Sequence, residues 1–295
     1  MGSGARVRAV QALGGGIAEA TDALTIDDAA GIRHRFVLQR WIRPGWETDD
    51  PGFDPAKEAA VLKALEPSAI PAPRLVAVDP DGSRAGVPAL LTERLPGRPP
   101  SIAHSARPAT LAILGSMLAE IHRVGARLTS VDALRVIVPP YVPFGDLAQA
   151  VIPTNTRRRD LWQAALDVAV STPDRSATPT LIHRDYHAWN TLWLSGQLTG
   201  IVDWTSTSWG PPAADLAHLR VDLVADVSVE AAVLARAAFA ASGGDLTNAR
   251  HHQLRTVFDY LTSMDPGLFD DAVVGRLDAF LELVLAEPDA PELPV

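Results

Sequence analysis

The stretch from residue 181 to residue 219 constrains this chain most, because it gathers polar side chains between apolar runs. It places His183, Asp185 and Asn190 in the pattern H-x-D-x-x-x-x-N, and an apolar strand-like run then leads to a second acid, Asp203. Carboxylate and amide oxygens hold Mg²⁺ beside a polyphosphate, and a further carboxylate can accept the proton of an attacking hydroxyl. The pattern therefore predicts a site that binds metal ions and a polyphosphate.

Composition narrows the possible partners. The chain has 295 residues, a length that suits one large domain or two lobes. Its formal net charge of -9 argues against nucleic acid as the main partner. It contains no cysteine, which excludes disulfides, thiolate catalysis and Cys-ligated zinc. No apolar run is long enough to cross a membrane, and residues 1–16 lack a signal-peptide core. We therefore expect a cytoplasmic protein that binds neither nucleic acid nor membrane, and its oligomeric state stays open.

The first part of the chain is predicted to be rich in β structure. Residues 13–42 alternate short apolar runs with turns, and residues 36–42 form the clearest strand. Gly14, Gly15 and Gly16 predict a turn between strands, where backbone N–H groups can approach phosphate oxygens. A glycine triplet is also typical of a simple flexible turn, so both interpretations stay open.

A helix is expected from Asp54, which can cap it, to about Glu66, which precedes a proline. Glu58 shares a face of this helix with valine and leucine side chains three, four and seven residues later. A carboxylate on an apolar face requires a partner, and the nearest upstream cations on a strand are Arg35 and Arg40. The alternative is that Glu58 lies at the edge of the apolar stripe, in contact with solvent.

A break in the pattern predicts where the chain divides. Residues 74–78 and 89–93 are expected to be strands, and the prolines and glycine within 96–100 then end this β-rich region. We therefore predict two lobes, residues 1–95 and residues 96–295, of which the second is mostly helical. Its expected helices are about 108–122, 157–170, 214–224, 228–242, 248–262 and 270–286.

The order of these motifs resembles the kinase-like phosphotransferases of the aminoglycoside phosphotransferase family. The most specific similarity is in HRDYHAWNTLW (183–193) and IVDWTSTSWGPPAADLAHL (201–219), with weaker similarity in KEAAVLKAL (57–65), LLTERLPG (90–97) and LAEIHRV (118–124). The resemblance implies an α+β, bilobal protein-kinase-like fold, with a small β-rich nucleotide-binding lobe and a larger, mostly helical catalytic and substrate-binding lobe. It also implies phosphorylation of a hydroxyl on a small molecule, with ATP and Mg²⁺ as cofactors.

The resemblance also implies a role for each matching residue. Asp185 is similar to the catalytic acid that orients and deprotonates the acceptor hydroxyl, and Asn190 and Asp203 are similar to the metal ligands. Glu58 is similar to the helix carboxylate that pairs with a strand cation gripping the phosphates. The remaining implied nucleotide-binding positions are Gly14, Gly15 and Gly16 over the phosphates, Val37, Gln39 and Arg40 on the strand, and the backbone of Glu93 and Leu95 at the adenine. His183 and Asp215 are implied as structural support.

Three positions depart from the family pattern. Gln39 stands where the strand cation is expected, with Arg40 adjacent, and strand alternation allows only one of the two to face the nucleotide. Arg184 replaces the usual glycine of the loop. A proline, Pro211 or Pro212, stands where the family often has aspartate.

These departures keep two alternatives open. A neutral Gln39 favours a non-catalytic nucleotide-binding protein that kept the fold, although the intact acids and amide of the loop and strand oppose it. The sequence HRD at 183–185 suggests a protein kinase. Against that interpretation, Trp204 follows the metal-binding aspartate where Phe-Gly is usual, and no A-P-E segment lies downstream.

Other polar residues have simpler interpretations. His187 could contact either substrate or solvent, and His122 is expected to be a core histidine beneath the catalytic loop. His251 and His252 lack a third ligand at metal spacing and are interpreted as surface residues. A group of acids could form a pocket for an amine-bearing acceptor, or could simply be solvated: Asp226, Glu230, Asp259, Asp265, Asp270 and Asp271.

Overall fold

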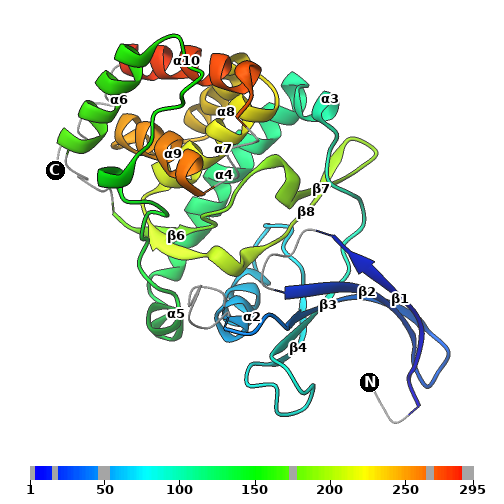
Figure 1. Cartoon of the computed structure of the whole chain (residues 1–295). Coiled ribbons are helices and arrows are strands. Elements are labelled where there is room, and N and C mark those ends of the chain that lie inside the picture. Colours follow the sequence, from blue (N-terminus) through cyan, green and yellow to red (C-terminus); the bar gives the residue numbers. More distant parts are fainter. Residues whose placement is uncertain (1–3, 15–18, 46–53, 173–177, 264–268, 288–295) are drawn as a thin grey trace. The chain divides into compact units, whose positions relative to one another are not determined.

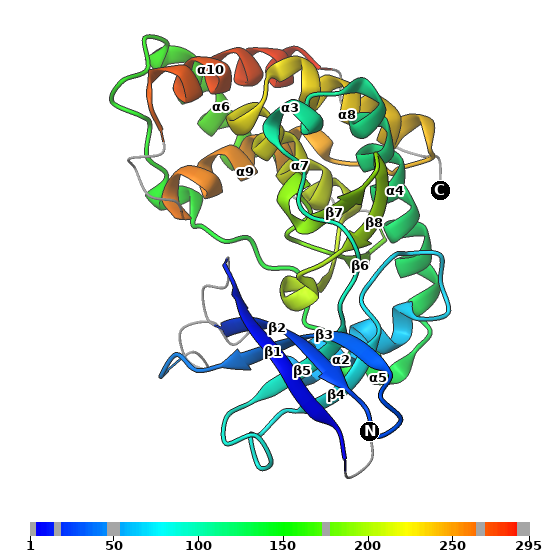
Figure 2. The same cartoon turned by 90° about the vertical axis from the view of Figure 1, so that its right-hand side faces the viewer.

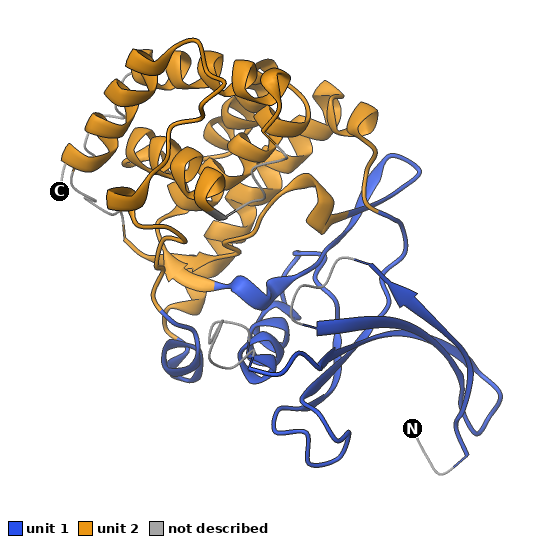
Figure 3. Ribbon diagram, in the orientation of Figure 1, with its two compact units in different colours: residues 1–98, 131–139, 192–207 blue, residues 99–130, 140–191, 208–295 orange. Residues whose placement is uncertain are grey.

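The computed structural model describes residues 4–14, 19–45, 54–172, 178–263 and 269–287. The chain forms two compact units (Figure 3). Unit 1 consists of residues 1–98, 131–139 and 192–207, and unit 2 consists of residues 99–130, 140–191 and 208–295. Two later segments of the chain therefore belong to unit 1. The division into lobes of residues 1–95 and 96–295 stays a prediction.

Unit 1 is built on a five-stranded antiparallel sheet with the strand order β1-β2-β3-β5-β4 (Figures 1 and 2). The strands are β1 (Arg6–Leu13), β2 (Glu19–Asp27), β3 (Arg33–Trp41), β4 (Leu75–Asp79) and β5 (Ala89–Glu93). The predicted β structure is thus confirmed, but the sequence analysis placed no strand as early as β1. Almost every side chain of this edge strand is exposed, so it carries no apolar periodicity that a sequence pattern could reveal.

The predicted helix at Asp54 is confirmed as α2 (Pro55–Leu65). The Asp54 carboxylate caps it by accepting a hydrogen bond from the backbone N–H of Ala56 at 2.7 Å. The apolar face is buried and carries Glu58 with it. In unit 1 this helix packs against β4, α5 (Asp132–Ile137) and the short helix η3 (Trp204–Ser206). The hairpin of β7 (Thr191–Leu194) and β8 (Gln197–Ile201) leads directly into η3.

Unit 2 is mostly helical, as predicted. Its helices are α3 (Ile102–Ser105), α4 (Pro108–Leu128), η1 (Leu147–Gln149), α6 (Arg159–Ser171), η2 (Ala188–Asn190), α7 (Pro212–Asp226), α8 (Val229–Ala241), α9 (Ala249–Ser263) and α10 (Asp271–Ala286). A short antiparallel pair, β6 (Thr180–Ile182) and β9 (Ser208–Gly210), lies among them. The predicted stripe of Leu111, Leu114, Leu118 and Ile121 on α4 is fully buried and forms the centre of this core.

The interpretation of His251 and His252 as surface residues is wrong. Their exposed fractions are 6% and 1%. Helix α9 packs against both α6 and α7, and the Tyr141 ring meets the His252 imidazole edge-on with 6.2 Å between centroids. A polar helix gives no sequence signal of such burial, because the covering elements come from distant parts of the chain.

No helix in the described parts of the chain combines the length and apolar character that crossing a bilayer requires.

Candidate functional site

One buried carboxylate, that of Asp215, binds the backbone of the loop that follows β6. Asp215, in the first turn of α7, accepts hydrogen bonds from the backbone N–H groups of His183 at 2.8 Å and Arg184 at 2.6 Å. The same carboxylate lies 2.9 Å from Nε2 of His122 on α4. Asp215, His183 and His122 are all buried, so these contacts are shielded from water. The loop is therefore fixed to two helices of unit 2 just before it reaches Asp185.

Arg184 occupies a backbone conformation that normally favours glycine. Its φ is +70°, which explains why the related pattern has glycine at this position. Its side chain compensates by tying the loop to a neighbouring segment: Nη2 donates to the carbonyl oxygen of Val142 at 2.7 Å, and the guanidinium lies 4.2 Å from the centre of the Phe144 ring. The replacement of glycine thus adds a link to residues 142–144.

The two oxygens of the Asp185 carboxylate have different neighbours. Oδ2 accepts a hydrogen bond from Nδ2 of Asn190 at 2.9 Å, and the same Nδ2 donates to the backbone carbonyl of Asp185 at 3.0 Å. Oδ1 lies 3.1 Å from Nε2 of His218 and 3.6 Å from Nε2 of His187. Burial alone would raise the pKa of Asp185, but polar and charge interactions with the two imidazoles hold this pKa well below the usual aspartate value. Asp185 is therefore kept as a carboxylate.

Sequence reasoning did not single out His218, although a signal was present. His218 lies three residues after Asp215 on α7, so both side chains project from the same face of that helix toward the loop. Asp222 follows one turn later and is buried. Burial raises the pKa of Asp222, while the charges of His187 and His218 oppose this shift. One face of α7 therefore supplies an imidazole and a carboxylate beside Asp185.

The acids that the sequence grouped as a possible pocket have separate structural roles among the described residues. Asp226 accepts a hydrogen bond from Nε1 of Trp189 at 2.7 Å, and Asp259 accepts one from the backbone of Gly145 at 3.2 Å. Asp270 caps α10, and Asp271 accepts a hydrogen bond from the Asn155 amide. Asp265 lies outside the described residues. These contacts account for Asp226, Asp259, Asp270 and Asp271 without a shared ligand, and Glu230 interacts with Ser228 at the start of α8.

Two candidate site residues of unit 1, Asp203 and Glu58, lie at η3 and α2. Strand β8 leads to Asp203, whose φ of +63° places it in the left-handed region, and η3 begins immediately after it. The Thr205 hydroxyl donates to the Glu58 carboxyl at 3.1 Å. Burial, followed by the negative charge of Asp203, raises the pKa of Glu58 to about 8. The structure thus buries Glu58 rather than leaving it in solvent, and makes it an electrostatic neighbour of Asp203.

The strand cation that was expected to pair with Glu58 has another partner. Nη2 of Arg40 lies 2.6 Å from Oδ2 of Asp22 on the adjacent strand β2. Gln39 lies next to Leu90 of β5 and, by strand alternation, projects from the opposite face of β3. Val37 shares that face with Gln39.

The remaining nucleotide-binding candidates are only partly described. Gly14 follows β1, whereas Gly15 and Gly16 lie outside the described residues. Glu93 ends β5, and its backbone N–H donates to the Arg74 carbonyl at 2.9 Å. Leu95 lies close to Gly200: a Cβ added at Gly200 would come within 2.7 Å of the Leu95 side chain.

The predicted site residues thus fall into two sets. Asp185, Asn190, His183 and Asp215 belong to unit 2, and the strand, hinge and helix positions together with Asp203 belong to unit 1. The convergence of the two sets on one nucleotide stays a prediction.

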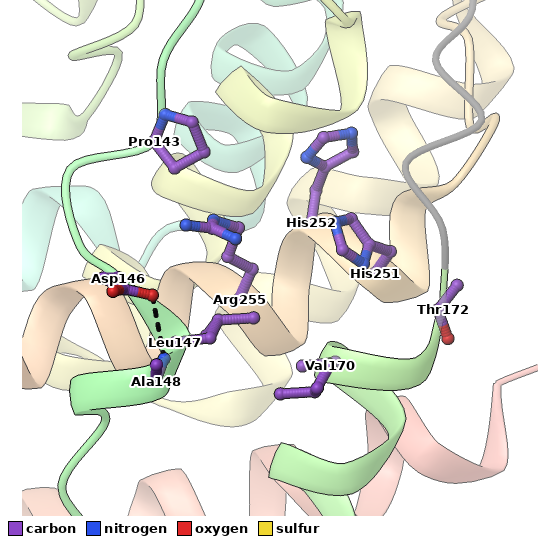
Figure 4. A pocket seen from close by; sticks show the side chains of 10 residues that line it. Pro143, Asp146, Leu147, Ala148, Val170, Thr172, His251, His252 and Arg255 are labelled. Atoms are coloured by element: carbon purple, nitrogen blue, oxygen red, sulfur yellow. Dashed lines mark hydrogen bonds between the residues drawn. The ribbon is translucent and has the colours of Figure 1, made fainter.

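Unit 2 also contains a cavity of about 430 Å³, lined by η1, the end of α6 and α9 (Figure 4). His251, His252 and Arg255 of α9 contribute to its wall. Arg255 is already engaged, because its guanidinium donates to the Gly145 carbonyl and lies 3.6 Å from the Asp259 carboxylate. No residue of the 183–190 loop lines this cavity, so the cavity is distinct from the candidate site, which we assign to the loop.

A small antiparallel sheet followed by a helical part, with an H-x-D loop held by a helix carboxylate, is the arrangement expected of the protein-kinase-like fold. Solved structures support this fold. The chain is similar to an amicoumacin kinase, hAmiN, in complex with AMP-PNP, Ca²⁺ and Ami, with a TM-score of 0.60, 14% identity, and coverage of 93% of this chain and 87% of that one. It is also similar to aminoglycoside phosphotransferase APH(4)-Ia in a ternary complex with ADP and hygromycin B, with a TM-score of 0.60, 18% identity and 96% coverage of both chains. The predicted protein-kinase-like fold is confirmed.

A sequence model of the phosphotransferase enzyme family matches residues 10–252, and the chain belongs to that family. A curated relative, acyl-CoA dehydrogenase family member 10 of Mus musculus, is 24% identical over 181 residues, which cover 55% of this chain. The match spans only 16% of the length of that relative. The predicted family resemblance is thus confirmed.

Proposed function

We propose that this protein is a small-molecule kinase that transfers the γ-phosphoryl group of ATP to a hydroxyl of its acceptor, with Mg²⁺ as the metal ion. The observation that carries the proposal is the fixed Asp185 carboxylate, held on a loop that Asp215 anchors to α7. Membership of the phosphotransferase enzyme family supports the reaction class. Solved neighbours in complex with AMP-PNP and Ca²⁺, or with ADP, support the use of a nucleotide and a divalent ion.

The mechanism depends on placement and charge rather than covalent chemistry. Asp185 orients the acceptor hydroxyl and takes its proton as the acceptor oxygen bonds to the γ-phosphorus and the bond from that phosphorus to the leaving ADP breaks. Nδ2 of Asn190 donates hydrogen bonds to Asp185, so the side-chain oxygen of Asn190, Oδ1, is the atom that remains to bind a metal ion. Asp203 would supply a carboxylate ligand from unit 1, so the donor set would consist of oxygens, which fits Mg²⁺. When bound, Mg²⁺ neutralises charge on the phosphate oxygens.

We further propose that phosphate binding here relies on the metal ion more than on a strand cation. Gln39 is neutral, and Arg40 is paired with Asp22 at 2.6 Å. Burial and the negative charge of Asp203 raise the pKa of Glu58 to about 8, so without a bound metal ion Glu58 favours the neutral form near pH 7, which needs no cationic partner. A neutral Glu58 and a neutral Gln39 are consistent with each other.

The acceptor is proposed to be a small molecule, because the similar amicoumacin kinase was solved with Ami and the similar aminoglycoside phosphotransferase with hygromycin B. The protein-kinase alternative has no such support. The non-catalytic alternative rests on Gln39 alone, and the fixed Asp185 opposes it.

A coupled assay of ADP release tests the proposal directly. The full chain with Mg-ATP should release ADP at an accelerated rate with at least one member of a panel of aminoglycosides, macrolides, choline and sugars. Mass spectrometry of the acceptor should then show the added phosphoryl group. Calorimetry that detects Mg-ATP binding, with no acceptor-dependent turnover across the panel, would support the non-catalytic alternative instead.

A further inference from the structure

The site around Asp185 holds more nitrogen ligands than a magnesium-dependent transfer needs. We propose that Asp185, His187 and His218 form a binding site for a divalent transition metal ion of the zinc class, separate from the proposed magnesium ligands. In the described part of the chain, these are the three residues whose ligand atoms gather closely enough to hold a metal ion, all within 4.8 Å of one another.

Two of the three ligand–ligand distances are close to those of a tetrahedral metal site. Zinc binds imidazole nitrogen and carboxylate oxygen at about 2.0–2.2 Å, which separates neighbouring ligand atoms by about 3.3–3.6 Å in a tetrahedron. Nε2 of His218 and Nε2 of His187 lie 3.1 Å and 3.6 Å from the same oxygen, Oδ1 of Asp185. Both imidazoles therefore present the same ring nitrogen toward one carboxylate oxygen, as ligands of a shared metal ion would.

The backbone holds these three ligands in place. Asp185 and His187 lie two residues apart on the loop, and His187 directly precedes η2. His218 comes from α7, the same helix whose Asp215 binds the loop backbone. The anchoring that fixes Asp185 therefore also fixes its distance from His218. Such preorganisation lowers the cost of binding a metal ion.

The ligands are accessible to an ion from solvent. The exposed side-chain fractions are 29% for Asp185, 17% for His187 and 18% for His218. Asp222, buried beside the site, interacts electrostatically with both imidazoles. A carboxylate near the ligating histidines is the usual support for a metal-bound imidazole.

The donor set separates this site from the magnesium site. Two imidazole nitrogens and one carboxylate suit zinc and related transition metals, whereas Mg²⁺ prefers oxygen ligands. Binding is therefore expected without nucleotide and without magnesium.

The consequence for catalysis rests on the proposed function. A metal ion on Oδ1 occupies the oxygen that faces away from Asn190 and that would take the acceptor proton. Zinc is therefore expected to inhibit phosphoryl transfer in competition with the acceptor rather than with the nucleotide.

Calorimetry on the full chain tests the metal site. ZnCl₂ titrated into wild-type protein, without magnesium, nucleotide or acceptor, should show binding of about one ion per chain. The variants His218→Gln and His187→Gln should each weaken this binding at least about tenfold. The matched control is His34→Gln, which removes a histidine that lies 3.0 Å from a single carboxylate, that of Asp28, and should leave zinc binding unchanged.

Two further measurements make the result decisive. Co²⁺ should give visible absorption bands in the wild type that are lost in His218→Gln, while circular dichroism and melting temperature show that the variant is folded. Failure of the folded wild type to bind zinc, or binding that persists in both site variants, overturns the inference.

The outcomes separate this inference from the proposed function. A chain that phosphorylates an acceptor but binds no zinc refutes the metal site alone. A chain that binds zinc through His218 but transfers no phosphoryl group refutes the proposed function alone. If both hold, the fractional inhibition by zinc should be lost in His218→Gln, whatever its basal rate.

Discussion

The two carboxylate oxygens of Asp185 have different neighbours, and the proposed phosphoryl transfer depends on both. Oδ2 is bound to the Asn190 amide and Oδ1 faces two imidazoles, so a single side chain couples the proposed magnesium ligand to the proposed acceptor. The sequence predicted the pair of Asp185 and Asn190, because their spacing on one loop is a local feature. It did not predict His218, which is 33 residues from Asp185 in the sequence (218 minus 185) and which helix α7 places beside it.

Replacing the carboxylate that we propose to be catalytic tests this residue directly. Asp185→Ala should lower kcat by about 10²–10⁴-fold or more, because the acceptor hydroxyl loses both its proton acceptor and its orientation. Asp203→Ala should also abolish turnover, and its loss of Mg-nucleotide affinity should exceed that of Asp185→Ala. Steady-state ADP release with an identified acceptor gives the rates. Asp167→Ala on the exposed surface of α6 is the control, and wild-type turnover in either site variant would contradict the assignment.

Glu58 gives a prediction about pH. Its pKa in the folded state, about 8, lies above the ordinary value of 4.5, so the folded state binds this proton more tightly than the unfolded chain does. The stabilising contribution is complete below pH 4.5 and is lost as the pH rises through about 8. The free energy of unfolding of the wild type should therefore decrease across this window relative to that of Glu58→Gln. Urea unfolding of both proteins without Mg²⁺ measures the difference, and parallel pH profiles would contradict a buried, neutral Glu58.

At the level of elements, close helix packing decides where the loop is anchored. Helix α4 carries both His122, which contacts Asp215, and Gly115, which lies against the backbone of α8. The apolar stripe of α4 was predictable from its period, whereas the need for glycine at 115 was not, because that need arises from the neighbouring helix. Similarly, α2 was predictable from its cap and its apolar face, but the edge strand β1 was not.

Two matched glycine substitutions separate packing from helix propensity. A Cβ at Gly115 would collide with backbone atoms of Ala235 and Phe239, so Gly115→Ala should destabilise the protein by about 1–3 kcal/mol. Gly275 lies in the exposed middle of α10 with nothing within 4 Å of its added Cβ. Gly275→Ala should therefore be neutral or stabilise by up to about 1 kcal/mol. Chemical unfolding compares the two, and equal effects would refute the packing argument.

At the level of the whole molecule, chain order and spatial order differ. Residues 131–139 and 192–207 belong to unit 1 although unit 2 begins before them. A sequence break at 96–100 predicts one boundary, but local patterns carry no information about which later segments return to an earlier unit. The predicted ligands of one nucleotide are consequently divided between units, with Asp203 in unit 1 and Asn190 in unit 2.

This division makes a prediction about ligand-dependent stability. Mg-ATP should raise the melting temperature of the whole protein, by the equivalent of about 2.7 kcal/mol at a concentration 100-fold above Kd. Chelation of Mg²⁺ by EDTA should remove most of this gain, because we propose that the metal ion rather than a strand cation holds the phosphates. Thermal unfolding with ATP, with and without EDTA, measures it. An undiminished gain in EDTA would show that protein cations hold the nucleotide.

The contact of Arg184 with Val142 and Phe144 has a practical consequence for protein engineering. Because Arg184 contacts residues 142–144, the two should be exchanged together when segments are swapped between relatives. A graft that imports a different segment should import the donor's residue at 184 with it, and libraries that diversify the two together should yield more working chimeras than libraries that vary either alone.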